Sequence, residues 1–75
     1  MKFNYAKKHE TVDKYPVLFL IEDAHKIKSA LRVLKVKTFD ELSRVNSFEL
    51  LNLGVPVKTL ELFKERVSQH GFRIK

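Results

Sequence analysis

The chain has 75 residues, with fifteen Lys and Arg against nine Asp and Glu, a net charge of +6 and no cysteine. This length allows one domain, and the lack of cysteine excludes disulfides and thiolate-held metal sites. The start is polar and charged, and the longest apolar run, residues 17–21, is far too short to span a bilayer. We therefore expect a soluble cytoplasmic protein whose positive charge favours polyanion partners.

Residues 1–15 contain few apolar anchors and are expected to form an N-terminal extended arm, either loose or an irregular strand packed through its aromatic residues. The run "PVLFLI" that follows suits either a buried extended segment or the entry of a helix. We expect two parts, the arm at residues 1–15 and a single helical domain at residues 16–75.

Periodicity and capping signals predict four helices after this segment. Apolar residues at steps of three and four predict a helix over 23–35, and Glu22 and Asp23 place acids at its start. Thr38 and Glu41 form a capping-box pattern that predicts a short helix over 39–45. Ser47 is the expected cap of another short helix through "FELLN", which would bury Phe48.

The fourth helix is predicted to start at Pro56, whose missing amide suits a first helical turn, and to end at Gly71. Its buried face is expected to be Val57, Leu60, Phe63 and Val67, and the tail "FRIK" can fold back on the core. The sequence thus predicts an all-α, compact four-helix domain in the order long, short, short, long.

The sequence contains no constellation typical of an enzyme. The three histidines, His9, His25 and His70, have no metal-ligand spacing, and the two glycines cannot make a phosphate loop. The adjacent acids Asp40 and Glu41 are explained by capping at a helix start. We expect no catalytic activity, no cofactor and no metal.

Two features are candidates for a binding function. The corner between the third and fourth helices, "LGVPVKTL", follows the plan of a helix-hairpin-helix, in which amides at a helix N-terminus face a DNA phosphate. Gly54 permits the left-handed turn, and Lys58 and Thr59 are placed for an ion pair and a hydroxyl bond to phosphate. Pro56 removes an amide at this corner.

The second feature is a run from residue 26 to residue 37 that contains five cations and no acid. Lys28, Arg32 and Lys35 lie within about 60° of each other on a helical wheel, beside the apolar stripe, with Lys26 and Lys37 flanking them. This basic ridge predicts contact with phosphate, provided that the ridge and the corner lie on one side of the domain.

About three quarters of the chain resembles the C-terminal domain of the bacterial RNA polymerase alpha subunit. The likeness rests on "IEDAHKIKSALRVLKVKTFDEL", "FELLNLGVPVKTLELFKERV" and "HGFRIK". In that family a helix-one arginine enters the DNA minor groove with support from an asparagine, and a hairpin glycine and a Lys-Ser pair bind phosphate.

Carried over, the arginine falls on Lys26 or Lys28, and the asparagine on Ser29 or Leu31. The Lys-Ser pair falls on Lys58 and Thr59, but the hairpin glycine falls on Pro56. The resemblance therefore implies weaker contacts directed at the DNA backbone, because lysine lacks the planar fork of arginine.

Two functions follow as hypotheses. The first is a small DNA-binding module acting in transcription, in a bacterium or as a bacteriophage protein in the host cytoplasm, which binds double-stranded DNA non-specifically or weakly specifically. Its expected contacts are Lys26, Lys28, Arg32, Lys35, Gly54, Lys58 and Thr59. The alternative is a protein-interaction module that docks on RNA polymerase or a transcription factor. Its expected contacts are Asp40, Glu41, Glu49, Phe3 and Tyr5.

Overall fold

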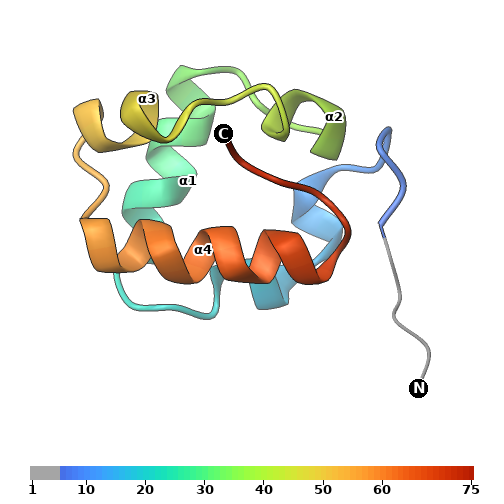
Figure 1. Cartoon of the computed structure of the whole chain (residues 1–75), viewed down its shortest axis with the longest axis horizontal. Helices are drawn as coiled ribbons and strands as arrows, with labels where there is room; N and C mark the ends of the chain where they lie inside the picture. Colours follow the sequence, from blue (N-terminus) through green and yellow to red (C-terminus); the bar gives the residue numbers. More distant parts are fainter. Residues whose placement is uncertain (1–5) are drawn as a thin grey trace.

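The computed structural model describes residues 6–75 and confirms an all-α, compact four-helix domain. Two 3-10 turns, η1 (Val12–Lys14) and η2 (Pro16–Phe19), precede the helices. The helices are α1 (Ala24–Val33), α2 (Phe39–Leu42), α3 (Ser47–Asn52) and α4 (Val57–Gln69), in the predicted order long, short, short, long. In Figure 1, α4 runs along the long axis, α1 rises steeply from near the start of α4, and α2 and α3 lie above α4.

The core forms where these helices and the two 3-10 turns meet. Its largest fully buried side chains are Phe39, Phe63, Leu18, Ile27, Leu42, Leu50 and Val67. The C-terminal tail returns between α4 and the short helices (Figure 1), buries Ile74, and stacks Phe72 on Phe39 with ring centroids 4.9 Å apart. The expectation that the tail folds back is therefore confirmed.

Each of the two short helices is capped at its start by a polar side chain. The capping box predicted for α2 is present, because Thr38 Oγ1 accepts from the Glu41 amide and Glu41 Oε1 accepts from the Thr38 amide. The expected cap of α3 was wrong by one residue. Asn46 Oδ1 accepts from the Phe48 amide at 2.8 Å, whereas Ser47 donates its hydroxyl to the Lys75 carbonyl at 2.7 Å.

Residues 6–15 are packed, as in the second of the two expected forms, but they hold a 3-10 turn and one isolated bridge residue, Thr11, and no strand. The Ala6 amide donates to the His70 carbonyl, and the Val12 amide donates to the Lys37 carbonyl at 2.8 Å. The Tyr15 ring meets Phe39 edge-on at 5.3 Å. The segment is therefore part of the folded unit. The "PVLFLI" run is a 3-10 turn and loop, in which Leu18 is buried.

Two residues predicted to be buried are instead exposed. Phe48 is 72% exposed because it lies about 160° from Leu50 around α3, so the two cannot share the core face. Val57 is 59% exposed because the buried face of α4 includes Thr59 in its first turn. Pro56 lies just before α4, not inside its first turn.

Candidate nucleic-acid interface

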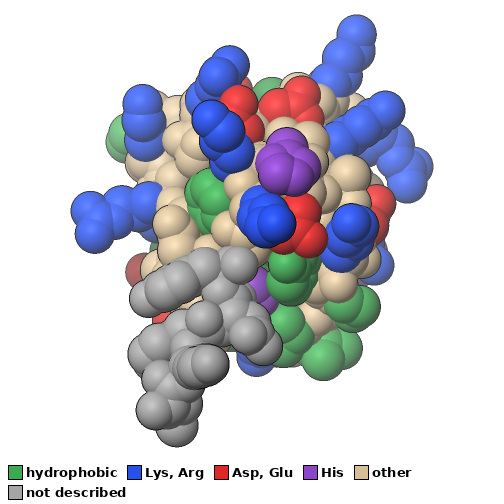
Figure 2. Space-filling model, turned by 90° about the vertical axis from the view of Figure 1, so that its right-hand side faces the viewer, with side chains coloured by type: hydrophobic (Ala, Val, Ile, Leu, Met, Phe, Trp, Pro, Cys, Tyr) green, Lys and Arg blue, Asp and Glu red, His purple; other side chains and the backbone are tan. Residues whose placement is uncertain are grey.

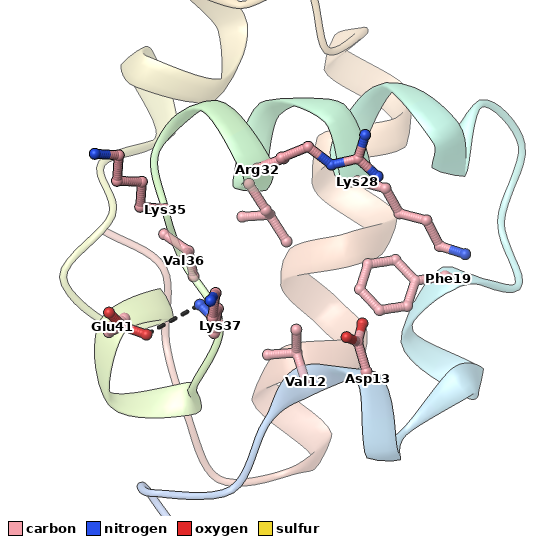
Figure 3. A pocket seen from close by; sticks show the side chains of 10 residues that line it. Val12, Asp13, Phe19, Lys28, Arg32, Lys35, Val36, Lys37 and Glu41 are labelled. Carbon is pink, nitrogen blue, oxygen red and sulfur yellow. Dashed lines mark hydrogen bonds between the residues drawn. The ribbon is translucent and has the colours of Figure 1, made fainter.

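A groove of about 510 Å³ lies between α1, the two 3-10 turns and the loop that leads to α2 (Figure 3). We call it the basic groove, because four cations line it: Lys28, Arg32, Lys35 and Lys37. Its apolar lining comes from both sides of the groove, namely Val12, Phe19, Leu31 and Val36. Two acids, Asp13 and Glu41, also line it.

The cations of the basic groove are available to a ligand. Within residues 6–75 the salt bridges join Lys14 to Glu10 and Arg44 to Asp40, and neither involves a groove cation. Glu41 is committed to its capping box, since Oε1 accepts from the amides of both Thr38 and Lys37. These hydrogen bonds from Thr38 and Lys37 lower the pKa of Glu41.

The end of α1 turns the chain so that it continues along the groove. The Val36 amide donates to the Leu31 carbonyl at 2.8 Å and the Lys35 amide to the Arg32 carbonyl at 3.1 Å, which is a Schellman motif. Lys35 occupies the position where glycine is usual, with a φ of 58°. The left-handed conformation strains a residue with a Cβ, so a lysine at this position costs about 1–2 kcal/mol.

One groove cation is held by an aromatic ring of the opposite side. The ammonium of Lys28 lies 5.2 Å from the centre of the Phe19 ring, within the range of a cation–π interaction. Phe19 in turn packs against the buried Phe63. In Figure 3, α1 runs along one side of the groove, with Val12 and Phe19 on the other.

Lys26 does not belong to this groove. Residues two apart on a helix lie about 160° apart around its axis, so Lys26 is on a different face of α1 from Lys28. Lys26 is exposed and is not among the residues that line the basic groove. The structure therefore brings together Lys28, Arg32 and Lys35, as predicted, and adds Lys37.

The corner between α3 and α4 has the predicted turn, with Gly54 at a φ of 95°. Its own amides are already used, because Gly54 donates to the Leu51 carbonyl and Val55 to the Leu50 carbonyl. The first hydrogen bond of α4 runs from the Leu60 amide to the Pro56 carbonyl, and no side chain caps the helix. The earlier amides of α4 therefore have no intrahelical partner.

Thr59 was wrongly predicted as a phosphate contact. Its side chain is 3% exposed, and its hydroxyl donates to the Glu22 carbonyl at 3.1 Å. The hydroxyl thus joins the start of α4 to the loop before α1, which removes it from any surface that a phosphate can reach.

Lys58 is exposed, but its surroundings are acidic. It lines a shallow hollow on α4 with Glu61, Leu62 and Glu65. Two carboxylates against one ammonium make this face a poorer site for phosphate than the basic groove.

The corner is not part of the basic groove. No residue from Gly54 to Lys58 lines the basic groove within the described part of the chain. Figure 1 shows the corner at one end of the long axis, with α1 in the same half of the view, whereas α2 and the N-terminal turns lie toward the other end. Figure 2 looks at that second end and shows Lys and Arg side chains standing out around it.

The acidic residues expected to bind a protein partner also stabilise the short helices. Glu41 and Glu49 close the capping boxes of α2 and α3, and Asp40 pairs with Arg44 at 3.1 Å. Phe3 and Tyr5, from the same hypothesis, lie outside the described residues.

The sequence analysis did not predict the side of the groove opposite α1, whose apolar lining is Val12 and Phe19. Val12 and Phe19 face α1 only because the N-terminal turns fold across it, and no local pattern signals a contact between segments so far apart in the chain.

Comparison of the chain with protein families, with curated proteins and with solved structures found no match. Among residues 6–75, no three histidine or acidic side chains form a group that could hold a metal ion. No helix in the described part of the chain has the length and apolar character needed to cross a bilayer.

Proposed function

We propose that this protein is a small DNA-binding module acting in transcription, which contacts the phosphate backbone of double-stranded DNA through the basic groove. The observation that carries the proposal is the set of four groove cations, none of which forms a salt bridge with residues 6–75. The resemblance to the RNA polymerase alpha C-terminal domain supports a role in transcription and a place in a bacterial cytoplasm.

The groove cations are suited to contacts with the DNA phosphate backbone, and not to reading a base sequence. Arg32 offers a planar fork, while Lys28, Lys35 and Lys37 are point charges on flexible stems. Phosphate contacts position a protein on DNA without discriminating between sequences. We therefore propose weak sequence preference.

The salt dependence of binding tests the proposal. Four phosphate contacts give a slope of about −3.6 in a plot of log K against log salt, so affinity should fall roughly a hundredfold between about 50 and 200 mM salt. Fluorescence anisotropy with a short A·T-rich duplex measures this change. A slope near zero would contradict a phosphate-directed mode.

Two charge reversals on α1 distinguish the contribution of the groove to duplex affinity from the contribution of the net charge. Arg32→Glu places an acid in the groove, and Lys26→Glu makes the same change in charge outside it. We expect Arg32→Glu to weaken duplex binding clearly more than Lys26→Glu. Equal losses would mean that the attraction is general and that the groove is not the contact surface.

A further inference from the structure

The apolar lining of the basic groove is not needed for DNA binding. A duplex presents its phosphates on a convex surface, which can meet the cations at the rim without reaching Val12, Phe19, Leu31 or Val36. The groove therefore combines two kinds of surface, and a ligand that uses both must be anionic and apolar at once.

We infer that the basic groove also binds an acidic peptide segment of a protein partner, in an extended conformation, with carboxylates toward α1 and an apolar side chain between them toward Val12 and Phe19. This inference does not rest on DNA binding. The volume of about 510 Å³ is that of a site for a few side chains.

The spacing of the cations matches an extended chain. Lys28 and Arg32 are four residues apart on α1, so they are separated by about 6 Å along the helix axis. In an extended peptide, residues i and i+2 point to one side at a separation of about 6.6 Å, and residue i+1 points to the other side. Two acids flanking one apolar residue thus meet Lys28, Arg32 and the apolar side together.

The side of the groove opposite α1, which is lined by Val12 and Phe19, favours a peptide over a single strand of nucleic acid whose bases would stack there. Lys28 already lies over the face of Phe19 at 5.2 Å, so that face is not free for a base to stack on it. An aliphatic side chain needs no free ring face, and it can pack against Val12 and Val36, which are both buried at the bottom of the groove.

One acidic residue of the groove should weaken the binding of an acidic peptide, and this effect can be tested. Asp13 lines the same groove and is exposed, so its carboxylate repels an acidic ligand. Asp13→Asn should therefore tighten peptide binding by a few-fold. Arg32→Glu should weaken it by about tenfold or more, and Lys26→Glu should change it much less.

The experiment is a titration of the full chain, labelled with ¹⁵N, with three probes under one salt condition. The probes are a short synthetic peptide in which aspartate and leucine alternate, the same peptide with glycine in place of leucine, and an A·T-rich duplex. We expect the Asp–Leu peptide to shift the amides of Phe19, Arg32 and Val36, and to bind more tightly than the Asp–Gly peptide.

The outcomes separate this inference from the proposed function. Equal binding of the two peptides would overturn the inference, because the apolar side would then contribute nothing. Binding of the duplex alone would also overturn it while leaving the DNA proposal intact. Binding of the Asp–Leu peptide without the duplex would support the inference and refute the DNA proposal.

Discussion

Replacing Lys35 by glycine should stabilise the domain while it weakens binding. Lys35 has a φ of 58° at the end of α1, in a Schellman motif closed by the Val36 amide and the Leu31 carbonyl. Its side chain is exposed and lines the basic groove, so removing it leaves no cavity in the core. Stability and binding should therefore change in opposite directions.

The size of the effect follows from the backbone. A left-handed conformation costs an L-residue about 1–2 kcal/mol, and glycine avoids this cost. Glycine also gives the unfolded chain more freedom, which offsets about 0.5–1 kcal/mol. We expect Lys35→Gly to raise the free energy of unfolding by about 0.5–1 kcal/mol. In a domain of this size that corresponds to a rise of about 2–8 °C in the melting temperature.

Thermal unfolding followed by circular dichroism measures this change, with Lys35→Ala as the matched control. Alanine removes the same charge but keeps the strain at a φ of 58°. Both variants should bind the duplex with a salt slope smaller by about 0.9, because each loses one phosphate contact.

Two results would refute this reasoning. If Lys35→Gly melts no higher than Lys35→Ala, the residue is not held in a strained conformation. If both variants bind the duplex with the affinity and salt slope of the parent protein, Lys35 is not part of the contact surface.

Three further predictions concern the corner and the capping boxes. Thr59→Val should lower the free energy of unfolding by about 1 kcal/mol, because the hydrogen bond to the Glu22 carbonyl is lost, and it should leave duplex affinity unchanged. A loss of affinity at unchanged stability would instead indicate that Thr59 contacts phosphate. Gly54→Ala should cost about 0.5–1 kcal/mol in urea unfolding, because the φ of 95° strains a residue with a Cβ by about 1–2 kcal/mol, while the loss of glycine's freedom in the unfolded chain offsets about 0.5–1 kcal/mol. The added Cβ meets no atom within 4 Å, so no clash adds to this cost, and an unchanged midpoint would argue against this turn. The hydrogen bonds that lower the pKa of Glu41 below 4.5 add stability that is present above that value and is lost as the pH falls through the folded-state pKa. Melting between about pH 5 and pH 3 should therefore show a smaller acid loss for Glu41→Gln than for the parent protein, and parallel curves would contradict the prediction.

The helices were predictable from local signals, since each signal acts within one turn. Thr38 and Glu41 are three residues apart and close the capping box wherever the rest of the chain lies. The error at α3 arose because Asn46 and Ser47 are both good caps, and the choice between them depends on the tail, whose Lys75 carbonyl engages the Ser47 hydroxyl.

The candidate site was predictable only in part. The ridge of Lys28, Arg32 and Lys35 follows from helical geometry and is present as expected. The role of Thr59 could not be inferred, because its partner is the Glu22 carbonyl, 37 positions away. The opposite side of the groove depends in the same way on packing between distant segments.

The basic groove exists only while the chain is folded, which links any ligand it binds to thermal stability. One side belongs to α1 and the other to residues 12–19, and the hydrogen bond from the Val12 amide to the Lys37 carbonyl ties residues 12–19 to the loop after α1. A ligand present at a hundred times its dissociation constant would add about 2.7 kcal/mol to the free energy of unfolding.

This linkage makes melting temperature an unbiased screen for the natural ligand. Inorganic phosphate, nucleotides, duplexes and acidic peptides can be compared in one plate, with Arg32→Glu as the background. For each anion, the rise in melting temperature of the parent protein is compared with the rise for Arg32→Glu. The anion with the largest difference between the two is the best candidate for the natural ligand of the groove.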